Sequence, residues 1–234
     1  MTYCVALRLD QGLLFMSDTR TNAGVDNIST FKKMFNWSVE GDRVITIMTA
    51  GNLATTQAVI SLLDERSVVP ADRKQTLLAA PTMFQVARLV GDTLKEVIHS
   101  QAEGQQESES TFSATMIVGG QIRGMEPRLF LIYPEGNFIE ASAETPFFQA
   151  GETKYGRPII LRAFDPAMSF EQAIKLLYVS FDSTLKANLA YKIDTFETGI
   201  LSRVSPEDPY FKVISSGWGE ALKEAFDKLP DFKF

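Results

Sequence analysis

The sequence predicts an α+β fold in which two antiparallel sheets pack face to face and a pair of helices covers each outer surface. Strand-like alternation fills the first fifty residues, two helical patterns follow, and a second group of strands precedes a second helical pair. No linker rich in Pro, Gly or Ser divides the 234 residues, and 45% of them are apolar. We therefore expect a single domain, residues 1–234, with one sizeable core.

The N-terminal region reads as two hairpins. The first joins strands over 3–9 and 13–17 through Asp10-Gln11-Gly12, and the second joins strands over 33–39 and 44–49 through Glu40-Gly41-Asp42. Because hairpin strands run in opposite directions, Thr2 and Asp18 are expected at the same end of the first hairpin.

Helical spacing of apolar residues and turn residues define the rest of the chain. Pro81 is expected to open the second helix and Ser169 to cap the fourth. An apolar stripe through Trp218 and Leu222 predicts a last helix packed in the core, with a subunit contact as the alternative. The four helices of the two pairs are expected over 52–67, 81–99, 153–163 and 169–187. The remaining strands are expected over 112–118, 128–133, 137–141, 194–204 and 210–215.

Composition excludes several classes of function. The chain has 23 Lys and Arg against 29 Asp and Glu, a net charge of -6, and no basic run, which argues against nucleic acid or an anionic membrane surface as partner. One cysteine, Cys4, and one histidine, His99, give neither an internal disulfide nor a zinc site of Cys and His. His99 is expected at a helix end on the surface. We expect no metal and no cofactor, and, without a signal or a membrane span, a cytoplasmic protein.

Thr2 is the residue that first suggests chemistry. Loss of Met1 would give it a free α-amine, whose pKa is ordinarily roughly 7.7 to 8.0, beside its own hydroxyl. A hydroxyl needs a nearby base to act as a nucleophile, and this amine would supply one. The alternative is that Thr2 is the polar end of a strand. A nucleophilic Cys4 would require removal of three residues.

The same mechanism needs a cation near the hydroxyl, a carboxylate to pair with that cation, and a donor for the oxyanion. Asp18 and the pair Lys32-Lys33 can meet the first two needs if the hairpins lie side by side. Gly51 stands where a strand turns into a helix, so its N–H can meet the third, although it can equally be a plain strand terminator.

These residues stand within a wider resemblance. The stretches TYCVALRLDQGLLFMSDTRTNAG, FKKM and TAGNLA resemble the N-terminal half of proteasome-type β subunits and are most similar to the bacterial Anbu (ancestral β-subunit) family. The resemblance implies the αββα fold of N-terminal nucleophile hydrolases, a peptide or protein substrate, and self-assembly into a ring or spiral. The chain has no phosphate-binding G-x-x-x-x-G-K-[ST] motif, so any use of ATP has to come from another chain, and a separate ATP-dependent unfoldase is a further partner that the resemblance allows.

Residue roles follow from the resemblance position by position. Thr2 is implied to be nucleophile and base, Asp18 and Lys33 the ion pair that tunes it, and Gly51 the oxyanion donor. Thr21 and Asn22 match positions that line the substrate groove, and Thr49 one that shapes the first specificity pocket. The spacing from Thr2 to Lys33 is one residue shorter than in the common pattern, so Lys32 competes for the lysine role.

The C-terminal half departs from the family's pattern. Gly151-Glu152 stands where active subunits have a serine after a glycine, and the run beginning at Asn188 stands where they have Asp-x-x-Ser-Gly. An extra carboxylate beside the amine would raise its pKa and make it a worse base. The sequence therefore predicts weak or narrowly specific peptidase activity, with a non-catalytic or Met1-blocked assembly subunit as the alternative.

Overall fold

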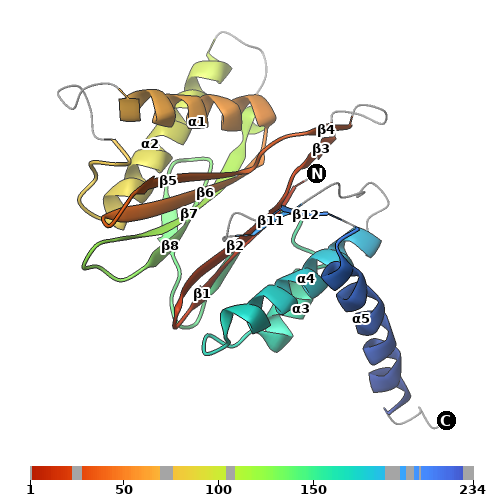
Figure 1. Ribbon diagram of the computed structural model, residues 1–234. Coiled ribbons are helices and arrows are strands. Elements are labelled where there is room, and N and C mark those ends of the chain that lie inside the picture. Colours follow the sequence, from red (N-terminus) through yellow and green to blue (C-terminus); the bar gives the residue numbers. More distant parts are fainter. Residues whose placement is uncertain are drawn as a thin grey trace.

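Two five-stranded antiparallel sheets form the centre of the protein (Figure 1). The structure is a computed structural model, and it describes residues 2–22, 28–68, 76–103, 109–187, 196–198, 203–205 and 207–228. The first sheet has the order β10 (Phe147–Gly151), β1 (Tyr3–Leu9), β2 (Gly12–Asp18), β11 (Phe196–Thr198) and β12 (Arg203–Val204). The second has the order β5 (Met34–Val39), β6 (Arg43–Gly51), β7 (Ala114–Ile122), β8 (Arg128–Ile132) and β9 (Phe138–Glu140). A separate two-stranded ribbon consists of β3 (Arg20–Asn22) and β4 (Ile28–Thr30).

Helices cover the outer faces of both sheets, as Figure 1 shows. The second sheet is covered by α1 (Leu53–Val68) and α2 (Met83–Ala102), and the first by α3 (Arg157–Ala163) and α4 (Phe170–Ala187). A further helix, α5 (Pro209–Asp227), packs against α4, and a short 3-10 helix spans Glu109–Phe112. The predicted sandwich of two sheets between two helix layers is confirmed.

The alternation along β1 decides which side chains meet between the sheets. Tyr3, Val5 and Leu7 belong to the cluster under α3 and α4, whereas Cys4 and Ala6 belong to the cluster between the two sheets. Successive side chains of a strand point to opposite faces. Carried one residue back, the same alternation puts Thr2 on the side of β1 that faces the second sheet.

Side-chain caps fix where the helices begin. Asn52 Oδ1 accepts the Thr55 N–H at 3.1 Å at the start of α1, and Ser169 Oγ accepts the Gln172 N–H at 3.3 Å at the start of α4, which confirms Ser169 as its cap. In α2 the cap is Thr82, whose hydroxyl accepts the Gln85 N–H. The prediction that Pro81 opens this helix was wrong by two residues, because the capping hydroxyl follows the proline.

The strand predictions fail in three places. Residues 210–215 are the first turns of α5, because Asp208 Oδ1 accepts the Phe211 N–H at 2.9 Å and caps a helix there. Strand β10 and the β3–β4 ribbon were not predicted, and each consists of five residues or fewer per strand. Of the closing strand predicted over 194–204, the structure has β11 and β12, and its remaining residues lie outside those described.

Core packing of the last helix was also predicted wrongly. Phe211 is the only described residue of α5 that is buried, and Trp218 is half-buried. Every described side chain over 220–228 is exposed, with Leu222 at 55%. Figure 1 shows why: α5 runs past the end of α4 and out from the body of the molecule.

Candidate active site

A buried ion pair joins the end of the first hairpin to the start of the second. Lys33 Nζ lies 2.7 Å from Asp18 Oδ2, and the two residues are 4% and 0% exposed. The other carboxylate oxygen, Oδ1, accepts the backbone N–H of Tyr3 at 2.8 Å. Asp18 therefore links the lysine to the residue that directly follows Thr2.

The structure brings Lys33, and not Lys32, to this carboxylate. Lys32 is exposed, and its ammonium lies 5.5 Å from the centre of the Phe35 ring. Lys33 is held from the second sheet as well, because its carbonyl accepts the Thr49 N–H at 2.9 Å. The competition between the two lysines for the carboxylate is thereby decided by geometry.

Thr2 is half-buried, and β10 holds its backbone. The Thr2 carbonyl accepts the Glu152 N–H at 2.6 Å. Gly151, which pairs with Tyr3, has φ 86°, and a Cβ there would lie 2.0 Å from the Thr2 oxygen. Only glycine allows this approach, so Gly151-Glu152 acts as a backbone clamp on Thr2.

The Glu152 carboxylate is turned toward its own loop, where Oε1 accepts the Lys154 N–H at 2.9 Å. A carboxylate held in this way caps a turn, which is a structural role. The other departure from the family's pattern, Asn188, lies outside the described residues, as does Met1.

Gly51 ends β6 at a sharp corner. Its φ is 119°, and an added Cβ would lie 2.5 Å from the Ser113 oxygen. The next residue, Asn52, donates its N–H to that same oxygen at 3.0 Å and caps α1. Gly51 thus lies just before the positive end of a helix dipole, two residues after Thr49, which is buried and contacts Lys33 through the backbone.

Cys4 has the properties of a structural thiol. It is 0% exposed, and its Sγ lies 3.7 Å from the Thr49 carbonyl oxygen as a weak donor. Burial raises the pKa of the Cys4 thiol strongly, and the Asp18 charge raises it further against the opposing effect of Lys33. A buried, protonated thiol is a poor nucleophile, so the geometry favours Thr2 over Cys4.

The positions expected to contact substrate lie on β3. Thr21 pairs with Ser29 and Asn22 with Ile28 in the β3–β4 ribbon, which Figure 1 shows next to the N-terminus. The side chains of Thr21 and Asn22 are outside the described part of the structure, as are Ala23 and Gly24. The prediction that Thr21 and Asn22 line the substrate groove stays a prediction.

Sequence reasoning missed a polar cluster behind Thr2. The hydroxyl of Tyr3, a residue 0% exposed, lies 2.6 Å from Ser180 Oγ on α4 and accepts the side-chain N–H of Gln149 on β10 at 2.7 Å. Burial raises the pKa of Tyr3 to about 12, so the phenol is neutral. In the sequence, a tyrosine at the start of a strand looks like an ordinary core residue, and nothing points to hydrogen-bond partners 146 and 177 residues away.

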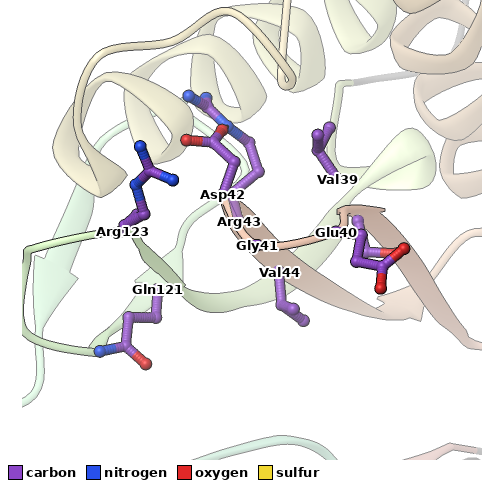
Figure 2. A pocket seen from close by; sticks show the side chains of 9 residues that line it. Val39, Glu40, Gly41, Asp42, Arg43, Val44, Gln121 and Arg123 are labelled. Carbon is purple, nitrogen blue, oxygen red and sulfur yellow. The ribbon is translucent and has the colours of Figure 1, made fainter.

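The hollow in Figure 2 is not part of this region. It has a volume of about 570 Å³, lies at the β5–β6 turn, and is lined by polar, apolar and charged residues that include Arg43 and Arg123. Arg43 begins β6 and Gly51 ends it, so the hollow lies roughly 25 Å from Gly51 at ~3.3 Å per strand residue.

Other classes of site receive no support from the described residues. They contain no cluster of three His, Cys, Asp or Glu side chains that could hold a metal ion. None of their helices has the length and hydropathy to cross a membrane. His99 is exposed in the last turn of α2, with Nε2 3.3 Å from Glu103 Oε1, which confirms it as a helix-end residue.

The comparisons with known proteins agree with this fold. The family described as "Proteasome subunit" matches residues 2–201. Among solved structures, Anbu (ancestral beta-subunit) from Yersinia bercovieri is 41% identical, covers 99% of this chain and 100% of its own, and has a TM-score of 0.90. Anbu from Hyphomicrobium sp. strain MC1 is 47% identical, with coverage of 99% and 100% and a TM-score of 0.87. The helical assembly of the Anbu complex from Pseudomonas aeruginosa is 40% identical, with coverage of 99% and 98% and a TM-score of 0.88.

A comparison with curated proteins found no significant match. The family match spans most of the chain, and the structural relatives are well above 30% identical over nearly its full length. The chain therefore belongs to the proteasome subunit family, and within that family it is similar to the Anbu proteins.

Proposed function

We propose that this proteasome-related subunit is a threonine-type hydrolase of peptide or amide bonds whose nucleophile is Thr2 after removal of Met1. The observation that carries the proposal is the buried pair of Asp18 and Lys33, connected through the Tyr3 N–H to the residue beside Thr2. Buried charges need partners, and this pair lies at the last residue of β2 and directly before β5, beside the start of β1. It supplies the positive charge that a threonine-amine mechanism needs.

In this mechanism the α-amine of Thr2 takes the hydroxyl proton while Oγ attacks the scissile carbonyl carbon. The carbonyl electron pair moves to oxygen, and the Gly51 N–H stabilises the oxyanion. The protonated amine then gives its proton to the leaving amine as the C–N bond breaks, which leaves an ester on Thr2. A water molecule, deprotonated by the same amine, hydrolyses the ester and restores the hydroxyl. Lys33 lowers the pKa of the amine by its charge.

The substrate is an extended peptide in this proposal. The β3–β4 ribbon lies next to the N-terminus, and an extended peptide can add to such a strand by backbone hydrogen bonds. Thr21 and Asn22 on β3 would supply those contacts, and Thr49 would border the pocket for the side chain before the cleaved bond.

The test uses a peptide epoxyketone, a probe that needs both functional groups of Thr2. The Thr2 oxygen adds to the ketone carbon, the hydroxyl proton passes to the ketone oxygen, and the amine nitrogen then opens the epoxide. A ring closes and no group leaves, so the mass of the protein rises by the whole probe. A chain that keeps Met1 has no threonine amine and cannot close this ring.

We expect wild-type protein to be labelled and Thr2→Ala to be folded and unlabelled. The matched control is Thr145→Ala, an exposed threonine two residues before β10, at the opposite end of that strand from Gly151; it should label like wild type. Labelling of Thr2→Ala would remove Thr2 from the mechanism.

One observation favours a second candidate, a non-catalytic assembly subunit. The Glu152 carboxylate is bound to its own loop, so it does not take the place of the serine and aspartate of active subunits. Intact mass of protein from its native host separates the two candidates. Met1 retained in essentially all molecules would favour the assembly subunit.

We also propose that the chain self-assembles through α5. A groove of about 740 Å³ lies between α3, α4 and α5, with apolar walls that include Leu176 and Trp218 and with Arg162 and Lys175 among its lining residues. The exposed half of α5 carries Leu222, three acidic residues and one lysine. An exposed helix end that carries an apolar side chain and a net negative charge, beside an apolar groove with basic residues, suits a second copy as partner. The related Pseudomonas aeruginosa protein forms a helical assembly.

Two charge insertions test this assembly. Leu222→Glu should shift the protein to smaller species in native mass spectrometry, because it puts a charge in the apolar contact. Val44→Glu, at a residue 54% exposed compared with 55% for Leu222, is the matched control at the β5–β6 turn. A wild-type chain that stays monomeric at all concentrations, or Leu222→Glu assembled like wild type, would contradict the proposal. An ATP-dependent unfoldase as further partner has only the family resemblance behind it.

A further inference from the structure

A chain of hydrogen bonds runs behind Thr2 through the layer between the first sheet and α4. Gln149 Nε2 donates to Tyr3 Oη at 2.7 Å, Tyr3 Oη lies 2.6 Å from Ser180 Oγ, and Ser180 Oγ lies 3.1 Å from the Gly156 carbonyl oxygen. Tyr3 and Ser180 are both 0% exposed. The chain joins β10, β1, α4 and the loop that leads into α3.

The number of hydroxyl protons decides which group donates in each of these hydrogen bonds. Ser180 has one hydroxyl proton, and the Gly156 carbonyl can only accept, so that proton goes to Gly156. The bond between the two hydroxyls is then donated by Tyr3, whose oxygen accepts from Gln149. Each hydroxyl donates once and accepts once, and bonds in such a chain strengthen one another.

The hydrogen-bonded groups fit together only because position 156 has no side chain. A Cβ at Gly156 would lie 1.9 Å from Tyr3 Oη and 2.5 Å from Ser180 Oγ. The φ of Gly156 is -82°, which any residue adopts, so the glycine is required here by the close approach alone. A phenylalanine at position 3 would pack against Phe181 equally well, since the ring centres are 4.6 Å apart and the hydroxyl takes no part in that contact.

Tyr3 is also the residue through which the candidate site holds Thr2. Its backbone N–H binds Asp18, the partner of Lys33, and it pairs with Gly151, next to the Glu152 N–H that binds the Thr2 carbonyl. Strand ends open more readily than strand centres. In the processed chain Thr2 would be the terminus itself, so its orientation depends on how firmly Tyr3 is fixed.

We propose that the Tyr3 hydroxyl, bound to Gln149 and Ser180, is a positioning group that holds the N-terminal threonine in its reactive orientation from the opposite face of the sheet. This inference rests on the proposed function. Tyr3 does not touch substrate; it acts through the backbone of β1 and β10.

The test compares Tyr3→Phe with Tyr178→Phe. The first variant keeps the ring and the backbone bond to Asp18 and removes the hydroxyl. The second removes a hydroxyl from the same helix layer, on α4, where the ring contacts Tyr210 and Phe211. For folded protein we expect Tyr3→Phe to lower the maximal rate of epoxyketone labelling, kinact, by about 10-fold with KI unchanged, because small misplacements of a reacting group lower rates steeply. Tyr178→Phe should keep the wild-type kinact.

A second readout does not depend on reactivity. Hydrogen exchange of the Glu152 amide, which is bound to the Thr2 carbonyl, should be about tenfold faster in Tyr3→Phe than in Tyr178→Phe, because strand ends open more often when their anchor is lost. Ser180→Ala should show the same two effects, and combining it with Tyr3→Phe should add little, since both changes break one chain. If Tyr3→Phe does not fold, Ser180→Ala carries the test.

The outcomes separate this inference from the function on which it rests. An unlabelled wild-type chain would refute the hydrolase, and exchange at Glu152 would still decide whether Tyr3 anchors Thr2. Labelling of wild type and of Tyr3→Phe at the same kinact, or equal exchange at Glu152, would overturn the positioning role.

Discussion

Neutralising one member of the buried ion pair should destabilise the fold far more than neutralising both. In Asp18→Asn the amide oxygen can still accept the Tyr3 N–H, but Lys33, 4% exposed, loses its counter-charge. In Lys33→Met the buried carboxylate loses its cation, and the new side chain has nearly the same length. The double variant leaves no buried charge at either position.

The magnitude follows from the burial of both groups. Removing one partner of a buried pair costs about 3 to 5 kcal/mol, whereas replacing both by neutral groups is often close to neutral. For a chain of this size, each kcal/mol corresponds to a change in Tm of about 2 to 4 °C, so each single variant should melt roughly 6 to 20 °C lower. The double variant should lose much less than the sum of the two.

Urea denaturation of the four proteins measures the coupling, provided the slope of the unfolding free energy with urea is the same in all. We expect a coupling energy of at least about 2 kcal/mol between positions 18 and 33. Single variants within about 1 kcal/mol of wild type would show that water screens the pair, as at a protein surface, and would refute the reasoning. The double variant should fold and yet resist labelling, because it lacks the charge that tunes the Thr2 amine.

Further predictions concern the lysine, the glycine corner and the buried phenol. Lys32→Ala should label like wild type in the epoxyketone assay; a loss as large as that of a Lys33 variant would reverse their assigned roles. Gly51→Ala should lower both the Tm and the labelling rate, since its Cβ would lie 2.5 Å from the Ser113 oxygen at a φ of 119°; a wild-type Tm and rate would contradict the requirement for glycine. Burial raises the pKa of Tyr3 from 10.0 to about 12, so the stability that the neutral phenol contributes is complete below pH 10 and is lost as the pH rises toward 12. In melting experiments at several pH values, Tyr3→Phe should reduce this loss of stability at alkaline pH. The loss that remains is due to Tyr178, whose pKa burial also raises to about 12.

Local sequence signals were sufficient for most of the fold. The alternating pattern of β1, β2 and β6 and the helical pattern of α2 and α4 agree with where each element packs, so periodicity, together with the turn and capping residues, located them. Residues 210–215 misled because Tyr, Phe, Val and Ile favour strands, while the deciding feature was a capping aspartate just before them. Whether the apolar face of α5 is buried could not be predicted, because a helical stripe shows which face is apolar and not what covers it.

The candidate site also has residues that the sequence predicted and residues that it did not. Asp18, the Lys32-Lys33 pair and Gly51 were predicted because a threonine mechanism needs their chemistry, and the resemblance favoured Lys33; the structure places Asp18 and Lys33 in contact. The anchor at Tyr3 depends on an approach between β1 and α4 across 177 residues, and on the missing side chain at Gly156. No local pattern encodes such a contact, since each partner alone resembles an ordinary core or helix residue.

Intact mass spectrometry of the native-host protein, before and after epoxyketone treatment, tests the central claim most directly. The account predicts a chain that lacks Met1, gains the whole mass of one probe, and carries it on Thr2. A chain that retains Met1, or a probe that still binds covalently to Thr2→Ala, would contradict it.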